Sequence, residues 1–289
     1  MAAVPTAAVT PVRRRRTRPR RPLWAYALLV LAGLLFAIPL FWLLSSSLKT
    51  NAEIYSWPLQ WLPSAPNLAN FTRAWESAPF DSFFVNSIVV TVAGTLGKVV
   101  LAVSTAYAFA FLRFPGKNIL FLFMIGALMV PGHVTLLVNY ITISNLGLIN
   151  TYAGIILPGL ASAFGTFLLR QHFLSLPAEV MEAASIDGAG HVRRLISFVV
   201  PMSRPAVVTV ALIAVIDEWN SFVWPLIATN SLDMRTLPIG LMFLKDAEGI
   251  NDWGVIMAGT VFVVLPMLLV FLFAQKYIIT GLAGAAIRK

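Results

Sequence analysis

Ionisable side chains inside apolar stretches are the residues of this chain best placed to do chemistry. Asp217 and Glu218 interrupt an apolar run from about 205 to 227. Lys98 interrupts a second run, from 82 to 112. At about 1.5 Å per helical residue, Asp217 would lie near the middle of its run. A charge at mid-membrane depth is costly and usually faces a cavity or a partner, so these positions are candidates for a transport pathway.

Aromatic and amide side chains accompany the two carboxylates. The segment continues with Trp219 and Asn220, and Trp224 follows four residues after Asn220. In a continuous helix Asn220 and Trp224 would share a face, and Pro225 would favour a kink at the outer end. Carboxylate and amide groups can bond sugar hydroxyls, while indole packs on the C–H face of a sugar ring. A second interpretation stays open, in which one carboxylate pairs with Lys98 or with a partner subunit and the tryptophans pack helices together.

The elements that would position these residues are transmembrane helices. The chain has 289 residues, of which 58% are hydrophobic and 11% charged, whereas a soluble domain carries about 25% charged residues. A helical span needs about 20 mostly apolar residues, and the runs predict an all-α polytopic protein with six of them. The expected spans are 23–45, 82–112, two spans within 118–169 that are separated near 144–150, 205–227 and 253–278.

Basic residues predict the orientation of the spans. Seven arginines crowd between Arg13 and Arg21, directly before the first apolar run. With the amino terminus inside, sixteen Lys and Arg residues fall on the inner face and four on the outer face, with Lys98 inside a span. We therefore expect a multi-pass membrane protein with both termini cytoplasmic. Residues 1–22 are expected to be a disordered basic tail attracted to membrane lipid, and 23–289 a single transmembrane domain.

This distribution of charge argues against nucleic acid as a partner, although the net charge is +9. The chain has no cysteine, which excludes disulfides and thiolate metal sites, and no metal site is expected. The segment 94–98 only superficially resembles a phosphate-binding loop, because its glycine spacing fails. We therefore expect a non-catalytic chain that carries no ATP site and no cofactor of its own.

A short helix is predicted in the loop of about 174–200, between the fourth and fifth spans. Ser175 is a possible cap, Pro177 would lie in the first turn, and Gly188 is suited to the left-handed conformation that ends a helix. The helix would present one modest apolar face. Small residues at 183 and 184 would let another protein approach the backbone closely.

The same loop carries Glu182-Ala183-Ala184, then Asp187-Gly188, and Pro201 thirteen residues after that glycine. This pattern resembles the coupling motif of ABC-importer permeases, with mild departures before the proline. Further segments resemble permeases of the maltose-transporter kind: Lys49-Thr-Asn-Ala-Glu-Ile-Tyr, Arg113-Phe-Pro-Gly-Lys117, Glu218-Trp-Asn with Trp224-Pro225, and Gly281-Leu-Ala-Gly-Ala-Ala.

The resemblance implies a type I importer permease fold with a cytoplasmic coupling helix, in the bacterial inner membrane. It implies a second homologous permease subunit, two ABC ATPase subunits that bind ATP and Mg²⁺, and an extracytoplasmic solute-binding protein. Residues Glu182, Ala183, Ala184, Asp187 and Gly188 would couple the chain to the ATPase, and alternating access would move a sugar or sugar-like solute.

Two carboxylates at mid-membrane would favour a neutral sugar, a polyol or a zwitterion over an anion. Lys98 beside the pair would reduce the local charge to about −1 and weaken that argument. The alternative function is an ion-coupled secondary transporter or channel with Asp217 and Glu218 as a cation or proton site. Six spans without an obvious inverted repeat weigh against it.

Overall fold

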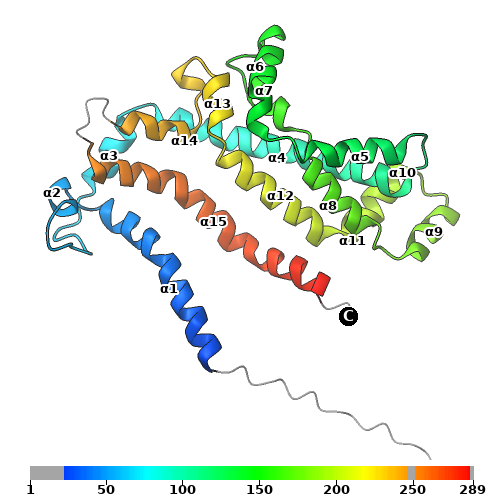
Figure 1. Ribbon diagram of the computed structural model, residues 1–289, viewed down its shortest axis with the longest axis horizontal. Coiled ribbons are helices and arrows are strands. Elements are labelled where there is room, and N and C mark those ends of the chain that lie inside the picture. Colours follow the sequence, from blue (N-terminus) through cyan, green and yellow to red (C-terminus); the bar gives the residue numbers. More distant parts are fainter. Residues whose placement is uncertain (1–22, 246–250, 287–289) are drawn as a thin grey trace, which may run out of the picture. The chain divides into compact units, whose positions relative to one another are not determined.

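The computed structural model describes residues 23–245 and 251–286, with side chains of the last helix described as far as Gln275. The predicted tail of residues 1–22 lies outside the described residues. The described part is helical (Figure 1). The α-helices are α1 (Leu23–Ser46), α2 (Asn51–Ile54), α3 (Ala69–Glu76), α4 (Phe80–Phe111), α5 (Lys117–Ala127), α6 (Leu136–Asn145), α7 (Tyr152–Ile156), α8 (Ala163–Phe173), α9 (Ala178–Ile186), α10 (His191–Arg194), α11 (Val200–Met202), α12 (Arg204–Trp219), α13 (Val223–Ala228), α14 (Leu237–Gly240) and α15 (Trp253–Ala286). Between them lie the short 3₁₀ segments η1 (Gly132–Thr135), η2 (Leu157–Gly159), η4 (Leu232–Met234) and η5 (Leu241–Leu244), and the π-helical segment η3 (Leu195–Val199).

The helices confirm the expected spans in number, with differences in their form. Among the described residues, α1, α4 and residues 253–275 of α15 are each long and apolar enough to cross a membrane. Three further spans result if each bent helix pair counts as one. These pairs are Lys117–Ala127 with Gly132–Asn145 (97°), Tyr152–Gly159 with Ala163–Phe173 (49°) and His191–Met202 with Arg204–Trp219 (85°). The separation between the third and fourth spans lies at 146–151, as predicted.

The expected continuous fifth span is wrong at its outer end. Helix α12 ends at Trp219, where the Asn220 amide N–H donates to the Ile216 carbonyl, and a new helix starts at Val223. Pro225 lies in the first turn of that helix, where a missing N–H costs no intrahelical bond. The chain therefore breaks before the proline. Asp217 stands two residues before the end of α12, and Asn220 and Trp224 do not share a helix face.

The chain divides into two compact units, residues 1–42 and 43–289, which are described separately. In the first unit, the α1 residues expose long apolar side chains. In the second, α4 packs along α8 and α12, and α12 packs along α15 (Figure 1). One cluster of buried residues joins α4, α8 and α12 around Ala106, Leu169 and Val210. These contacts hold α4 and α12 side by side.

Hydrogen bonds from polar side chains stabilise the connection between α1 and α4. Asn70 is fully buried, and its side-chain amide donates to the carbonyls of Ser47 and Lys49 at 2.9 and 2.8 Å. Glu53 accepts hydrogen bonds from the Thr50 and Ser64 amides, both at 2.9 Å, and from the Ser64 hydroxyl. These bonds, with that of Ser64 foremost, lower the pKa of the Glu53 carboxyl to about 2.

Candidate functional site

A polar cavity of about 290 Å³ lies where α4, α12 and the two bent spans between them meet. It contains both carboxylates and the lysine singled out in the sequence. Its lining residues are Lys98, Gly132, Leu136, Asn139, Ile155, Pro158, Gly159, Asp217, Glu218, Ser221 and Trp224. The mixture of charged, amide, hydroxyl and indole groups around one hollow is suited to a polar solute rather than an apolar one.

Lys98 and Glu218 form a salt bridge in this cavity. The Lys98 ammonium lies 2.9 Å from Glu218 Oε1, and the two side chains are only 14% and 9% exposed. The bridge joins α4 to α12, so the lysine pairs with Glu218 and not with Asp217. Two charges removed from water in this way stabilise each other, and the loss of either partner would leave a buried, uncompensated charge.

Gly94 leaves room for the Glu218 carboxylate, and Gly159 lies close to the same ion pair. A Cβ added to Gly94 would lie 2.7 Å from Glu218 Oε1 and 2.8 Å from its Cδ, closer than real Cβ atoms come. Gly94 lies one helical turn before Lys98 on α4. Gly159 approaches from the other side, where an added Cβ would lie 3.6 Å from Lys98 Cε. A side chain at position 94 would therefore have to displace the Glu218 carboxylate from its place beside Lys98.

Asp217 is placed differently from its neighbour. Its side chain is exposed at the cavity wall, and among the described residues it has neither a hydrogen bond nor an ion pair. Lys98, Asp217 and Glu218 together carry a net charge of about −1. As noted from the sequence, this charge weakens the electrostatic preference for a neutral solute over an anion. Asp217 is thus the carboxylate available to a solute, while Glu218 is engaged by Lys98.

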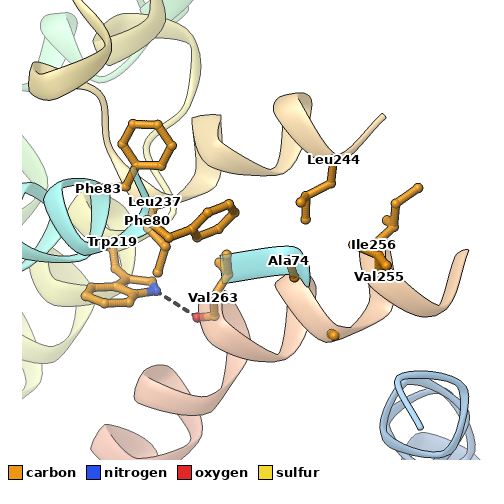
Figure 2. Packing of buried hydrophobic residues seen from close by; sticks show 10 residues of the cluster. Ala74, Phe80, Phe83, Trp219, Leu237, Leu244, Val255, Ile256 and Val263 are labelled. Carbon is orange, nitrogen blue, oxygen red and sulfur yellow. Dashed lines mark hydrogen bonds between the residues drawn. The ribbon is translucent and has the colours of Figure 1, made fainter. Parts of the chain in front are cut away.

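The two tryptophans of the segment have separate roles. The Trp224 indole N–H donates to the Ile155 carbonyl at 3.0 Å, which holds the half-buried ring in the cavity wall. Trp219 is 5% exposed and donates to the Val263 carbonyl of α15 at 3.0 Å. Figure 2 shows Trp219 in a cluster of buried apolar side chains that includes Phe80 and Phe83. Trp219 therefore packs helices together and does not line the cavity.

Asn220 lies in an adjoining hollow of about 390 Å³. This hollow shares Ser221 and Trp224 with the cavity and is also lined by His133. The Asn220 side-chain amide donates to the Ile216 carbonyl at 2.8 Å, which caps the end of α12. Sequence reasoning did not single out Asn139 or Ser221, although an amide in the uncharged stretch 118–169 was a signal that could have found Asn139.

The predicted coupling loop forms a second candidate site. Helix α9 (Ala178–Ile186) matches the expected helix, and Gly188 follows it with φ of +71° in the left-handed region. The predicted cap is wrong, because Ser175 donates to the His172 carbonyl and Pro177 stands at the N-cap without a side-chain bond.

Burial separates the five motif residues of this loop. Glu182, Ala183, Asp187 and Gly188 are exposed. Ala184 is 2% exposed, and its carbonyl accepts the Ala189 amide at 2.9 Å. The expectation that both alanines offer an approachable surface is therefore corrected, since Ala184 packs inward.

The coupling loop contacts the helices that hold the cavity. Met181 of α9 packs against the buried cluster shared by α4, α8 and α12. The Tyr107 hydroxyl of α4 lies 3.2 Å from His191 Nδ1. Tyr107 and Lys98 are nine residues apart on α4, about 14 Å along the helix axis. One rigid helix therefore connects the loop to the ion pair.

The chain matches a known family over much of its length. Residues 98–283 match the family described as "Binding-protein-dependent transport system inner membrane component". A permease protein of the sn-glycerol-3-phosphate transport system (UgpE) of Agrobacterium fabrum is 34% identical, over 92% of this chain and 97% of the relative. The proteins of the same name from Brucella suis and Yersinia pestis are 33% and 31% identical, over 92% and 91% of this chain and 97% and 96% of each relative.

A solved structure has the same fold. It is described as a bacterial ABC transporter involved in the import of the acidic polysaccharide alginate. One of its chains superimposes with a TM-score of 0.78 at 23% sequence identity, covering 88% of this chain and 95% of that chain. The resemblance inferred from the coupling motif is therefore confirmed for both family and fold.

Proposed function

Because the chain belongs to the family of inner membrane components of binding-protein-dependent transport systems, we propose that it conducts a sugar or sugar-like solute through the cavity at Lys98, Asp217 and Glu218. The observation that carries the proposal is the buried Lys98–Glu218 bridge between α4 and α12, beside an unpaired carboxylate. Alternating access requires two arrangements of the helices around one site. The Lys98–Glu218 pair would hold α4 and α12 together in one arrangement, and separation of the pair would allow the other.

The energy for transport would come from partner subunits. The proposed assembly is this chain, a second homologous permease, two ABC ATPase subunits and an extracytoplasmic solute-binding protein. ATP and Mg²⁺ would be bound by the ATPase pair, and this chain would be non-catalytic, without an ATP site. The sixteen-to-four distribution of basic residues supports a cytoplasmic location for both termini and the proposed coupling loop, the side on which the ATPase subunits would bind.

The proposed coupling surface is the exposed part of the α9 loop, formed by Glu182, Ala183, Asp187 and Gly188. Ala184 would support it from beneath. Movement of this surface with the ATPase would reach α4 through Tyr107 and α12 through the shared buried cluster. Since α4 carries Lys98 and α12 carries Glu218, the same movement would act on the cavity.

The solute we propose is neutral, such as a sugar or a polyol. The local charge of about −1 disfavours an anion, because the like charge of Asp217 repels it. We propose Asp217, Trp224 and Asn220 as its contacts, with Glu218 held by Lys98 and Trp219 assigned to packing. A phosphate ester is the second candidate, because the relatives named above belong to a glycerol-3-phosphate transport system.

Uptake by the complete importer in proteoliposomes distinguishes these candidates. Radiolabelled neutral sugars and polyols are compared with glycerol 3-phosphate, each with the solute-binding protein present and ATP enclosed. We expect ATP-dependent uptake of a neutral solute. Efficient transport of a purely anionic solute would refute the charge argument. Uptake that is abolished by an ionophore and indifferent to ATP would instead support the ion-coupled alternative.

A further inference from the structure

The loop between α4 and α5 forms a shallow, open basic pocket that the proposed function does not use. It has a volume of about 510 Å³ and lies at the Arg113-Phe-Pro-Gly-Lys117 segment. Its lining residues are Leu112, Arg113, Phe114, Gly116, Lys117, Asn118 and Ile119. Two of these residues are cationic and none is a carboxylate.

The cations around this pocket are held in place by backbone carbonyls. Lys117 Nζ donates to the Leu112 carbonyl at 2.9 Å and lies 3.4 Å from that of Ala110. Arg170 of α8 donates through Nε to the Phe109 carbonyl at 3.1 Å. Both side chains thus lie at the carboxyl end of α4, while Arg113 is exposed.

No carboxylate neutralises these cations within the described residues. The salt bridges there join Arg73 to Asp252 and Lys98 to Glu218. Carbonyl groups at a helix end supply only about half a negative charge. The cluster of Arg113, Lys117 and Arg170 therefore keeps a net positive charge, which an anion would neutralise.

The neighbouring surface indicates what kind of anion would fit. Helix α5 starts in the pocket, and the exposed apolar side chains at its start include Ile119, Leu120, Leu122 and Phe123. Because α5 begins a membrane span, the pocket stands at the end of an apolar helix face. A ligand with an anionic head and a hydrocarbon tail matches both parts.

We propose that this pocket binds the phosphate headgroup of an anionic phospholipid in the cytoplasmic leaflet, with Arg113 and Lys117 as the contacts. The side of the membrane rests on the orientation in the proposed function. A phosphate diester accepts charge-assisted hydrogen bonds from guanidinium and ammonium groups. Basic pockets at the cytoplasmic ends of membrane helices suit such headgroups. The acyl chains would cover the exposed face of α5.

Lipid binding to the complete importer tests this site. Nanodiscs of phosphatidylcholine are doped with phosphatidylglycerol, and native mass spectrometry measures the affinity of the importer for the anionic lipid. We expect Arg113→Gln to weaken retention about tenfold, because one charge-assisted contact is lost, and Arg113→Lys to restore most of it. Arg204→Gln is the matched control, since Arg204 is also exposed and lies outside the pocket. It should retain the lipid.

Several results would overturn the proposal. Equal retention by Arg113→Gln and Arg204→Gln would show that the pocket is not the lipid site. Displacement of the lipid by millimolar inorganic phosphate would show that a free phosphate is the occupant. A cross-link from position 113 to a partner subunit would show that protein covers the pocket. Uptake by the same variants in proteoliposomes is measured separately from these outcomes, and both leaflets of the nanodisc contain the lipid, so failure here leaves the transport and orientation proposals intact.

Discussion

Removal of one partner of the Lys98–Glu218 bridge should destabilise the protein strongly, whereas removal of both should not. At 2.9 Å and an effective dielectric constant of about 20, the attraction between the charges is about 6 kcal/mol before desolvation is counted. Loss of one partner leaves the other charge with a side chain only 14% or 9% exposed. Because the cavity admits water, we take the lower end of the cost for such pairs, about 3 kcal/mol for Lys98→Met or Glu218→Leu alone.

The double variant should be close to neutral, because two apolar side chains of similar volume then pack where two charges met. With single variants that each cost about 3 kcal/mol and a near-neutral double variant, the coupling free energy in this cycle should be about 6 kcal/mol. Asp217→Asn is the matched control, since Asp217 is exposed and unpaired in the described part of the chain. It should change the free energy of unfolding by less than about 1 kcal/mol.

The chain has no cysteine, so a single cysteine can report unfolding. Ala258, which is fully buried, is a suitable position, and thiol labelling of Ala258→Cys during denaturant titration of the purified importer gives the midpoint for each variant. If the effects of the two single variants on the free energy of unfolding were additive, with a coupling below about 1 kcal/mol, the proposed interaction between Lys98 and Glu218 would be refuted. Uptake separates the roles further. Asp217→Asn should lower uptake without unfolding the chain. Unchanged uptake in both Asp217→Asn and Glu218→Gln would show that the two carboxylates only help to pack the helices.

Three further outcomes are expected. Ala183→Trp should abolish transport and weaken association with the ATPase while membrane insertion persists, because the bulky ring occupies an exposed part of the proposed coupling surface; intact copurification and uptake would contradict the coupling role. A cysteine at Gly190 should react only with membrane-permeant thiol reagents and one at Asn67 from outside, and reversed labelling would overturn the orientation. Glu53, whose pKa falls to about 2 in the folded chain against 4.5 as the ordinary value, contributes stability that is present above pH 4.5 and lost as pH falls through about 2. Hydrogen exchange at the Ser64 amide should therefore be protected at pH 5 and accelerate, relative to the Glu53→Gln variant, as pH falls below about 4.

The sequence alone predicted the features that depend on local physics. Lengths of apolar runs set the number of spans, because each helix must cross a hydrocarbon layer of fixed thickness. Gly188 marked the end of the coupling helix, because a left-handed residue after a helix favours glycine. The coupling motif indicated the family for a similar reason, since its residues lie within one short segment.

Only the tertiary structure decided which side chains meet. Lys98 and Glu218 are 120 residues apart, and their pairing depends on how α4 and α12 are rotated against each other, which no local pattern records. Trp219 is buried against α15 at the end of α12, whereas Trp224 lies in the cavity wall on α13, because the chain breaks between these two tryptophans of one short segment. The early end of α12 also escaped prediction, because Pro225 is as compatible with the first turn of a new helix as with a kink in a longer one. Packing between helices, rather than sequence spacing along one of them, determines which carboxylate pairs with Lys98 and which is left exposed at the cavity wall.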